Sequence, residues 1–205
     1  MKLLNSGYET ESVGGSLYWN AQSGTCYNGS KNATGSCNFT STGLKNDTTR
    51  NLIAETTYYT RGHNTSSIFV DAMYDKERVS GTVITGVTPT RTLTWTGKVA
   101  IPYPSDYGYA ADLSLCQKQL SSYNDATCTA NNWMKNILGT SSYGRLLTPN
   151  SGYANYAWYV NSSGLVDNLS NAYLARGVAP VLSLTSELDI GSGSGTSSSP
   201  YQLAV

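Results

Sequence analysis

Apolar residues in the first half of the chain recur with a helical period. Across residues 47–60, Leu52, Ile53 and Thr56 fall on one side of such a helix. Gly62, a residue type that often follows a helix end, comes shortly afterwards. The pattern therefore predicts a first helix over residues 47–60.

The segment from residue 66 to residue 78 shows the same spacing. Ser66 or Ser67 can cap a helix there, since a serine hydroxyl can accept from the backbone N–H groups of the first turn. Its expected apolar face consists of Ile68, Phe69, Ala72 and Met73. The charged residues expected off that face are Asp71, Asp75, Lys76 and Glu77.

Patterns with a period of two residues predict strands along much of the rest of the chain. Residues 92–101 alternate loosely between apolar and polar. Pro102 should end this strand, because proline has no backbone N–H to donate. From Gly144 onward the turn residues become denser and the apolar runs shorter. Strands are expected there at 145–148, 157–161, 164–167 and 178–184.

Two short helices and a glycine-rich end complete the pattern. Residues 112–120 and 131–138 are expected to form the helices. Residues 191–200 are almost entirely Gly, Ser and Thr, and residues 201–203 follow as a short strand. The glycine-rich run is either a linker or the turn of a hairpin. The apolar residues of the 131–138 helix are Trp133, Met134, Ile137 and Leu138.

Helices beside short strands, together with the composition, predict a packed domain of the α+β class. The chain has 205 residues and is 39% hydrophobic, with 16 tyrosines and 4 tryptophans. Side chains of this size bury enough apolar area to form a core. The length suits one domain over residues 1–205. Residues 1–41 are rich in Gly, Ser, Thr and Asn, and they belong either to that domain or to an N-terminal extension.

The charge balance argues against nucleic acid and membranes as partners. Lys plus Arg number 13, as do Asp plus Glu, and no basic run is present. Phosphate backbones and anionic lipids attract clustered cations, so neither is an expected partner. No apolar run is long enough to span a membrane, and polar residues follow Met1 to Leu4 where a signal peptide would stay apolar. We expect no direct membrane insertion.

The four cysteines form two local pairs. Cys26 and Cys37 are 11 residues apart, and Cys116 and Cys128 are 12 apart. Neither pair is a CxxC motif, and a single histidine cannot complete a Cys/His zinc site. We expect two local disulfides, with crossed pairing as the alternative. Disulfides persist in oxidising surroundings, so we expect an extracellular, cell-surface or virion location.

The residues best suited to catalysis are isolated along the chain. His63 is the single histidine, and its neighbours predict a solvated turn rather than a general base. Asp106 lies in a tight turn and is expected to bond nearby backbone. No phosphate-binding, zinc-protease or serine-hydrolase motif is present. We expect no cofactor, no bound metal and no enzymatic activity.

One cluster of carboxylates is an exception to this isolation. It consists of Asp71, Asp75 and Glu77. Lys76 and Arg78 lie between and beside them, which is typical of a solvated helix face rather than a catalytic acid pair. We therefore expect all three carboxylates to be hydrated.

Residues 149–176 have the composition of a binding surface. Tyr, Asn, Ser, Gly and Asp dominate the segment. Tyrosine offers a large rigid contact area, and the small polar residues offer adaptable hydrogen bonds. Trp158 and Val160 alternate with Tyr159 and Asn161, so one side of this strand should face the core and the other should be displayed.

Several blocks of the sequence resemble the C-type-lectin-like domains of bacterial, archaeal and viral surface proteins. The resemblance covers most of residues 40–205, with one departure at Ala179, where that family usually has Arg. It implies an α+β fold in which two helices pack on a small, mostly antiparallel sheet with long loops. The blocks that carry it are residues 95–101, 103–110, 146–151, 157–164, 177–184 and 195–203.

Within that family, the chain is similar to the variable proteins of diversity-generating retroelements, akin to the phage major tropism determinant. This similarity implies a fixed frame that includes Trp158, Val160, Val178, Val181 and Leu184. It also implies a set of displayed, exchangeable positions that contact a ligand. These positions are Tyr153, Asn155, Tyr156, Leu165, Asp167, Asn168, Leu169, Ser170, Asn171 and Tyr173.

The expected function is therefore that of a binding module for a protein or a cell-surface ligand, with the oligomeric state left open. Two alternatives remain. One is a structural subunit of a pilus or virion that binds no ligand. The other is an enzyme similar to the formylglycine-generating enzymes, which have a related fold. That enzyme would need a reduced, reactive Cys116 or Cys128.

Overall fold

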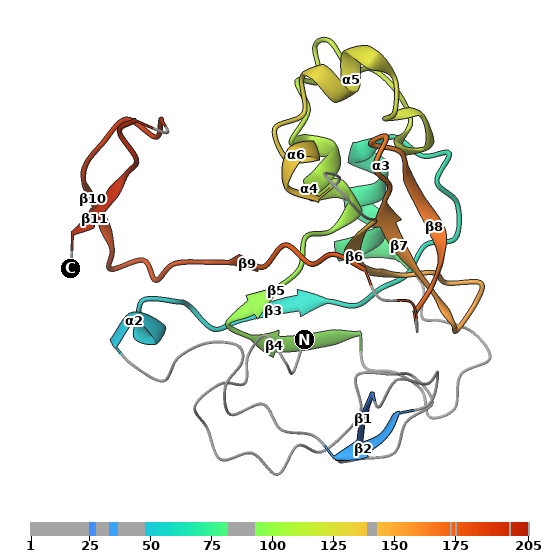
Figure 1. The fold of residues 1–205 in the computed structure, drawn as a ribbon, viewed down its shortest axis with the longest axis horizontal. Helices are drawn as coiled ribbons and strands as arrows, with labels where there is room; N and C mark the ends of the chain where they lie inside the picture. Colours follow the sequence, from blue (N-terminus) through green and yellow to red (C-terminus); the bar gives the residue numbers. More distant parts are fainter. Residues whose placement is uncertain are drawn as a thin grey trace.

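The computed structural model describes a mixed helix and strand domain (Figure 1). Residues 1–24, which include much of the expected N-terminal extension, lie outside the description, as do Cys37 and Tyr173. The described residues are 25–27, 33–36, 48–81, 93–138, 143–172, 174, 176–196 and 198–204.

The helices are short, and none that the structure describes is long and apolar enough to cross a membrane. They are α2 (Thr48–Asn51), α3 (Val70–Asp75), α4 (Pro104–Tyr109), α5 (Ala126–Ala130) and α6 (Lys135–Leu138). A π-helical turn, η1 (Lys76–Ser80), continues α3, and a 3₁₀ turn, η2 (Leu120–Ser122), precedes α5.

The strands form small antiparallel sheets. The three-stranded sheet has the order β6-β7-β8, and the remaining pairs are β1-β2, β3-β4, β5-β9 and β10-β11. This arrangement confirms the α+β class with small antiparallel sheets. The strands are β1 (Thr25–Tyr27), β2 (Ala33–Ser36), β3 (Thr56–Tyr59), β4 (Thr94–Gly97), β5 (Val99–Ala100), β6 (Gly144–Pro149), β7 (Tyr156–Val160), β8 (Val166–Asn171), β9 (Val181–Leu182), β10 (Asp189–Ser192) and β11 (Gln202–Ala204).

The main core joins α3 and α4 to the inner face of the β6-β7-β8 sheet. Trp158 and Val160 of β7 are fully buried while Tyr159 is not, which confirms the alternation expected for this strand. Full burial of a large apolar side chain contributes roughly 1.5–3 kcal/mol, so this cluster stabilises the domain strongly. Its largest members are Met73, Tyr107, Leu120, Tyr123, Leu146, Trp158, Val160 and Val166.

A disulfide fastens the loops beside this core. Cys116 and Cys128 are bonded, with their Cα atoms 4.7 Å apart. Both residues are buried among the core side chains. The predicted local pairing is therefore confirmed for this pair. The pairing of Cys26 with Cys37 falls outside the described residues.

The predicted helix over residues 47–60 is wrong beyond its first turn. The chain leaves the helix after Asn51 and forms strand β3, in which every residue pairs with β4. The Thr-Thr-Tyr-Tyr sequence of β3 consists of β-branched and aromatic residues, which suit a pleated surface. Lys98 donates to the carbonyls of Arg50 and Ile53 where the helix ends.

The second helix begins later than predicted and buries a different face. Phe69 stands at its N-cap without a side-chain cap, and Val70 is the first helical residue. The buried positions are Val70, Met73 and Glu77, whereas Phe69 and Ala72 are exposed. The buried residues and the residues of the predicted face both have helical spacing, so spacing alone could not show which face of the helix is buried.

Three further expectations need correction. Residues 112–120 contain turns rather than a helix, and the helix expected at 131–138 starts at Lys135. Trp133 and Ile137 are exposed, whereas Met134 and Leu138 are buried. Between residues 178 and 184, the strand is confined to β9. The predicted frame residues exposed there are Val178 and Leu184.

The glycine-rich end is a hairpin, as one of the two interpretations predicted. β10 and β11 pair antiparallel, with Ile190 opposite Leu203. Gly193 and Gly195 have φ angles of +97° and +76°, values that few other residue types adopt without strain. Figure 1 shows the hairpin set apart from the core, at the end of the extended segment that contains β9.

Candidate functional site

The β7-β8 hairpin places a row of tyrosines on the outer side of the three-stranded sheet. Residues opposite each other on antiparallel strands point to the same face. Tyr159 pairs with Asp167 and Tyr156 pairs with Asn171, and both β8 partners alternate with buried neighbours. The register shifts between Ala157 and Tyr159, where β8 has one residue more than β7, and both tyrosines pair with outward residues of β8.

Aromatic contacts join these residues to two further tyrosines. Tyr153 and Tyr156 meet edge to face with ring centroids 5.4 Å apart, and Tyr143 and Tyr159 do the same at 5.4 Å. The Arg176 guanidinium lies 4.2 Å from the centre of the Tyr143 ring. We call the resulting surface the tyrosine face. It consists of Tyr143, Tyr153, Tyr156, Tyr159, Asp167, Leu169 and Asn171.

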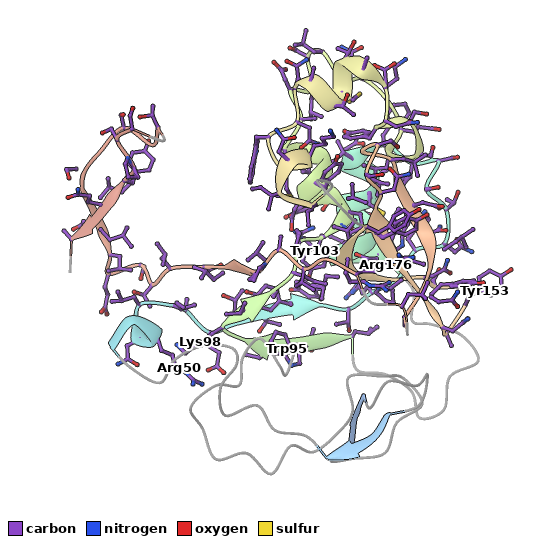
Figure 2. All side chains as sticks on the ribbon, in the orientation of Figure 1. Arg50, Trp95, Lys98, Tyr103, Tyr153 and Arg176 are labelled. Carbon is purple, nitrogen blue, oxygen red and sulfur yellow. A yellow bond between two sulfur atoms is a disulfide. The ribbon has the colours of Figure 1, made fainter. Side chains whose placement is uncertain are left out.

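The tyrosine face combines apolar area with hydrogen-bonding groups at its edges. Tyr153 is 58% exposed and Leu169 is 52% exposed, and Figure 2 shows Tyr153 projecting away from the domain. The Tyr159 hydroxyl donates to Asp167 Oδ2 at 3.3 Å. Burial, followed by the nearby Asp167 carboxylate, raises the pKa of Tyr159, so its hydroxyl stays protonated at neutral pH. Large exposed rings of this kind mark interaction surfaces.

Two residues that were expected to be displayed point into the domain instead. Asn168 is 4% exposed and Ser170 is 2% exposed. The expectation of display is wrong for both, because β8 extends through residue 171 and every second side chain of a strand faces inward. Arg176 Nε donates to the Ser170 hydroxyl at 3.1 Å.

The other predicted site residues lie at or near the tyrosine face. Tyr153 and Leu169 are exposed; Tyr173 lies outside the described residues. Asn155 donates to Asn171 Oδ1 at 3.0 Å and borders the face, while the Leu165 N–H bonds to Asn161 in the hairpin turn. The half-buried residues of the predicted set are Asn155, Tyr156, Leu165, Asp167 and Asn171.

Two members of the tyrosine face, Tyr143 and Tyr159, were missing from the predicted set, as was Arg176, which contacts the Tyr143 ring. Tyr159 could have been included, because strand alternation already placed it opposite Trp158. Tyr143 and Arg176 precede β6 and follow β8 respectively, and no local pattern indicates that they meet. They come together through the fold, because the segments before β6 and after β8 lie side by side, as the hydrogen bond from Gly177 N to Tyr143 O records.

Two polar side chains, the buried Asn150 and the half-buried Arg145, fix the shape of this region. Asn150 accepts from the N–H groups of Gly152 and Tyr153 at 2.7 and 3.1 Å, and donates to the Asn168 carbonyl at 3.0 Å. Arg145 donates to carbonyls at the end of β8 and just beyond it. Burial, followed by the charge of Arg176, lowers the pKa of Arg145 to about 10. The carbonyls that Arg145 contacts are those of Ser170, Asn171 and Leu174.

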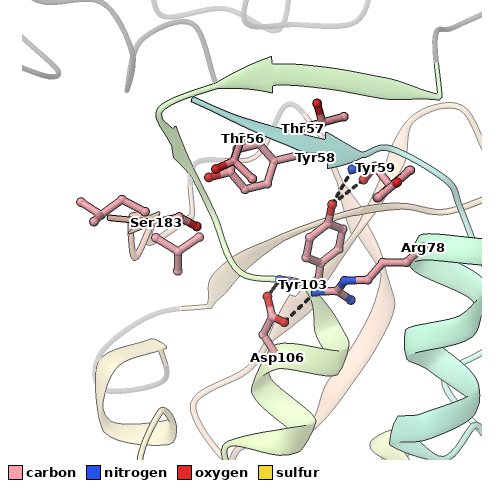
Figure 3. Close-up of a pocket in the computed structure, with 10 residues that line it drawn as sticks. Thr56, Thr57, Tyr58, Tyr59, Arg78, Tyr103, Asp106 and Ser183 are labelled. Atoms are coloured by element: carbon pink, nitrogen blue, oxygen red, sulfur yellow. Dashed lines mark hydrogen bonds and ion pairs between the residues drawn. The ribbon is translucent and has the colours of Figure 1, made fainter. Parts of the chain in front are cut away.

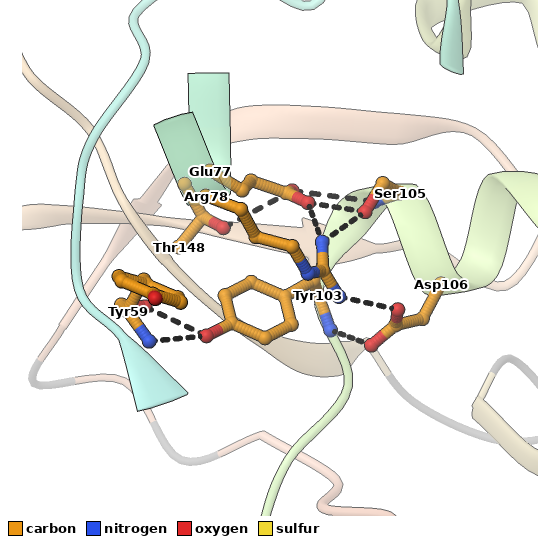
Figure 4. Close-up of polar contacts among 7 residues, drawn as sticks. All are labelled: Tyr59, Glu77, Arg78, Tyr103, Ser105, Asp106 and Thr148. Atoms are coloured by element: carbon orange, nitrogen blue, oxygen red, sulfur yellow. Dashed lines mark hydrogen bonds and ion pairs between the residues drawn. The ribbon is translucent and has the colours of Figure 1, made fainter. Parts of the chain in front are cut away.

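A second polar cluster connects η1, α4 and β6 behind the sheet (Figure 4). Glu77 is fully buried and accepts from the Ser105 N–H at 3.2 Å, the Thr148 hydroxyl at 3.2 Å and the Ser105 hydroxyl. Burial raises the pKa of Glu77 to about 8, although the bonds from Ser105 and the charge of Arg78 act in the opposite direction. The expectation of a hydrated Glu77 is therefore wrong.

Arg78 links this cluster to the start of α4. Its Nη1 donates to Glu77 at 3.0 Å and its Nη2 donates to Asp106 at 2.8 Å. The guanidinium lies 4.1 Å from the ring centre of Tyr103 and 4.3 Å from that of Tyr74. Asp106 also accepts from the Tyr103 N–H at 2.9 Å, so its carboxylate bonds to nearby backbone as predicted.

His63 is not the solvated residue that the sequence indicated. Its ring stacks on Trp158, with centroids 6.3 Å apart, and its carbonyl accepts from Trp158 Nε1 at 2.9 Å. Burial, followed by the charge of Lys76, lowers the pKa of His63. Within the described residues, no group of three or more His, Cys, Asp or Glu side chains is placed to hold a metal ion.

No model of a known protein family matches the chain, and neither a curated protein nor a solved structure matches it. The interpretation of the site therefore depends on its own geometry.

Proposed function

We propose that the chain is a binding module that contacts a protein or cell-surface target through its tyrosine face. The observation that carries the proposal is the contrast between the two sides of one hairpin. Trp158, Val160 and Val166 are fully buried on the inner side, whereas Tyr153 and Leu169 are exposed on the outer side. Such a surface can bind without disturbing the core beneath it.

A C-type-lectin-like frame with exchangeable outer positions is part of this proposal. The mixed α+β architecture and the packing of α4 against β6 support it. The buried residues of the predicted set, Asn168 and Ser170, are excluded from the exchangeable positions. Replacing a buried polar residue would leave its hydrogen-bond partners unsatisfied. The exchangeable positions that remain are Tyr153, Asn155, Tyr156, Leu165, Asp167, Leu169 and Asn171.

An extracellular, cell-surface or virion location belongs to the same proposal. The Cys116–Cys128 disulfide supports it, because such bonds persist in oxidising compartments. The same bond weighs against the enzyme alternative, which needs one of these two sulfurs as a reduced thiol. We therefore favour binding over catalysis.

A structural subunit remains a second candidate, and one observation favours it. The β10-β11 hairpin exposes Ile190, Tyr201 and Leu203 to solvent. An isolated two-stranded hairpin is marginally stable in water, so contacts with another molecule would stabilise it. Light scattering tests this candidate: a defined oligomer that an Ile190→Asp variant dissociates would support it.

The binding proposal is tested by asking whether the tyrosine face accepts new side chains and new targets. A displayed library would be randomised at Tyr153, Tyr156, Asp167, Leu169 and Asn171 and selected against hen lysozyme as a defined protein. We expect most members to remain folded and specific binders to be enriched. A matched library at five exposed positions of the β10-β11 hairpin and α6 serves as the control.

The outcome depends on how the two libraries compare. Enrichment from the tyrosine-face library alone would support a dedicated binding surface on a tolerant frame. Equal enrichment from both libraries, or loss of folding in most tyrosine-face members, would contradict the proposal. Circular dichroism and display level distinguish unfolded variants from folded variants that do not bind.

A further inference from the structure

A small cavity lies between β3, the start of α4 and β9, and it shares no residue with the tyrosine face. Its volume is about 300 Å³. This is at the lower end of the range for ligand pockets, so it has room for one small ring rather than an extended chain. Figure 3 shows Tyr103 and the Arg78–Asp106 pair on one side of it and Thr56 and Tyr58 on another.

Within β3, one residue leaves its main-chain groups open on the side of the cavity. In an antiparallel pair, residues two apart turn their N–H and C=O to the same edge. The Tyr103 hydroxyl accepts from the Tyr59 N–H at 2.7 Å and donates to the Tyr59 carbonyl at 2.8 Å, so these groups point away from β4. Thr57 therefore turns one donor and one acceptor to the same edge, where the cavity lies, and neither group has a partner among the described residues.

This open position is too short for an added strand. A peptide that extends a sheet bonds to alternate residues along the edge strand. Tyr103 already occupies the groups of Tyr59 on one side of Thr57. On the other side, the Ala54 N–H donates to the Ser183 carbonyl at 2.8 Å, so the segment that contains β9 approaches the chain just before β3. The edge therefore suits a ligand that brings a single donor and a single acceptor.

The remaining walls of the cavity are apolar. Val181, Leu182 and the ring of Tyr58 line it. The ring of Tyr58 is itself held by stacking on Trp95, with centroids 5.6 Å apart. A flat or aliphatic group of a ligand can therefore lie against these side chains while its polar end meets Thr57.

The charged residues at the cavity neutralise each other. Arg78 and Asp106 both line it, and they are joined at 2.8 Å. Because opposite charges at this distance largely cancel, the pair favours neither an anion nor a cation as the ligand. An uncharged polar group suits the cavity best.

The direction of the two Thr57 groups selects one kind of uncharged group. A trans secondary amide turns its N–H and C=O in opposite directions, so it cannot meet both Thr57 groups. A primary carboxamide has two hydrogens on its nitrogen, and one of them lies on the same side as the oxygen. This N–H can donate to the Thr57 carbonyl while the carboxamide oxygen accepts from the Thr57 N–H.

The two nearest charged analogues of a carboxamide fit less well. A carboxylate sets a second acceptor against the Thr57 carbonyl, and an amidinium sets a second donor against the Thr57 N–H. Each leaves one main-chain group of Thr57 facing a group of its own kind, which discriminates against that ligand.

We propose that this cavity binds a primary carboxamide, either as a free small molecule or as the Asn or Gln side chain of a protein partner. The carboxamide forms two hydrogen bonds with the main chain of Thr57, and the group that carries it lies against Val181, Leu182 and the ring of Tyr58. The site is separate from the tyrosine face and does not depend on its function.

The test is a titration of the isotope-labelled full chain with four compounds of similar size, followed by amide NMR signals. Benzamide offers a donor and an acceptor on the same side, benzoate only acceptors and benzamidine only donors. N-methylbenzamide keeps both groups but, as a trans amide, turns them apart. We expect benzamide to move the Thr57 amide proton downfield and to shift the signals of Tyr59 and Ser183. The other three compounds should bind about tenfold more weakly.

Two further compounds test the geometry and the source of the ligand. The lactam 2-piperidone is a secondary amide whose ring holds the N–H and C=O on the same side, so it should shift the same signals as benzamide. N-acetylglutamine N-methylamide carries the glutamine side chain, and the matching glutamate compound is its control. Tighter binding of the glutamine compound than of benzamide indicates a protein side chain as the ligand, and weaker binding indicates a free small molecule.

A matched pair of variants isolates the main-chain contact. Thr57→Pro removes the N–H that faces the cavity without removing a ladder bond, because that group points away from β4. Thr96→Pro is the control, since Thr96 pairs with Thr57 and turns its own N–H to the opposite edge of the sheet. With the Ser183 signal as the readout, we expect Thr57→Pro to weaken benzamide binding about tenfold and Thr96→Pro to leave it unchanged. If either variant fails to fold, the compound series on the wild type still decides.

Several results would overturn the proposal. Equal binding of benzamide and N-methylbenzamide would show that the direction of the amide groups does not matter. Tighter binding of benzamidine or of benzoate would place the contact at Asp106 or at Arg78 instead of Thr57. Equal effects of the two proline variants, or no shift at Thr57 and Ser183 with any amide at millimolar concentration, would also contradict it. Failure of the tyrosine-face library would leave this inference untouched.

Discussion

Replacing Tyr103 by phenylalanine removes one oxygen atom and with it two hydrogen bonds. The hydroxyl accepts from the Tyr59 N–H at 2.7 Å and donates to the Tyr59 carbonyl at 2.8 Å. The ring itself stays in place beneath Arg78, whose guanidinium lies 4.1 Å from the ring centre. The variant therefore isolates the contribution of a side chain that takes the place of a neighbouring strand.

The expected loss follows from the two bonds. A hydrogen bond contributes about 0.5–1.5 kcal/mol net, so removing both should cost about 1–3 kcal/mol. Tyr59 is half-buried, so water can replace part of what is lost, and we expect about 2 kcal/mol. In a domain of this length, that corresponds to a fall of about 4–8 °C in the melting temperature.

Urea unfolding followed by tryptophan fluorescence measures this loss as a lower midpoint with an unchanged slope. Tyr58→Phe is the matched control, because Tyr58 is also a buried tyrosine of the same region. Its hydroxyl has no hydrogen-bond partner that meets ordinary geometry among the described residues. Burial raises the pKa of Tyr58, and the nearby Thr56 side chain acts in the opposite direction. Removing this hydroxyl should leave stability unchanged or raise it by up to about 1 kcal/mol.

The reasoning would be refuted if Tyr58→Phe destabilised the protein as much as Tyr103→Phe. It would also be refuted if Tyr103→Phe left the urea midpoint where it is in the wild type. Either result would mean that the edge of β3 is held by something other than the Tyr103 hydroxyl.

The remaining predictions concern three other parts of the fold. Because burial raises the pKa of Glu77 from 4.5 to about 8, its protonated form is favoured in the folded state. The contribution of Glu77 to the free energy of unfolding should therefore be greatest below pH 4.5 and fall as the pH rises toward about 8. The urea midpoint of the Glu77→Gln variant should vary less than that of the wild type across this pH range. Reducing the Cys116–Cys128 bond should lower the free energy of unfolding by about 2–3 kcal/mol, and equal urea midpoints with and without dithiothreitol would argue against this. In thermal unfolding, Leu169→Ser should change the stability by less than about 0.5 kcal/mol, whereas Asn150→Ala should lower it by about 2–3 kcal/mol. Similar values for both variants would contradict the interpretation of Leu169 as a displayed residue and of Asn150 as a structural one.

The sequence predicted best where a strict strand period coincides with large side chains. Trp158 and Val160 were expected inside and Tyr159 outside, and the structure agrees. Two residues of β8 were misplaced, because the predicted strand ends at residue 167 and the family resemblance implied that Asn168 and Ser170 are displayed. Extending the same period of two through residue 171 would have placed Asn168 and Ser170 inside.

Other parts of the site could not be predicted from local patterns. The buried face of the second helix consists of Val70, Met73 and Glu77. The apolar pattern did not indicate this face, because glutamate is a charged residue type. The carboxyl group of Glu77 is tolerated there because Ser105 and Thr148 donate to it, and both lie far away in the sequence. Tyr143 and Arg176 likewise meet only through the tertiary fold.

The way Asn150 and Arg145 hold the tyrosine face has a consequence for how it can evolve. Asn150 bonds to the amide groups of Gly152 and Tyr153 and to the carbonyl of Asn168, and Arg145 bonds to three carbonyls. Every residue type carries the same carbonyl, and every type except proline carries the same amide hydrogen. Mutation can therefore rewrite Tyr153 or Asn171 without weakening these attachments. The shape of the surface is therefore conserved by main-chain contacts, while its side chains can change independently.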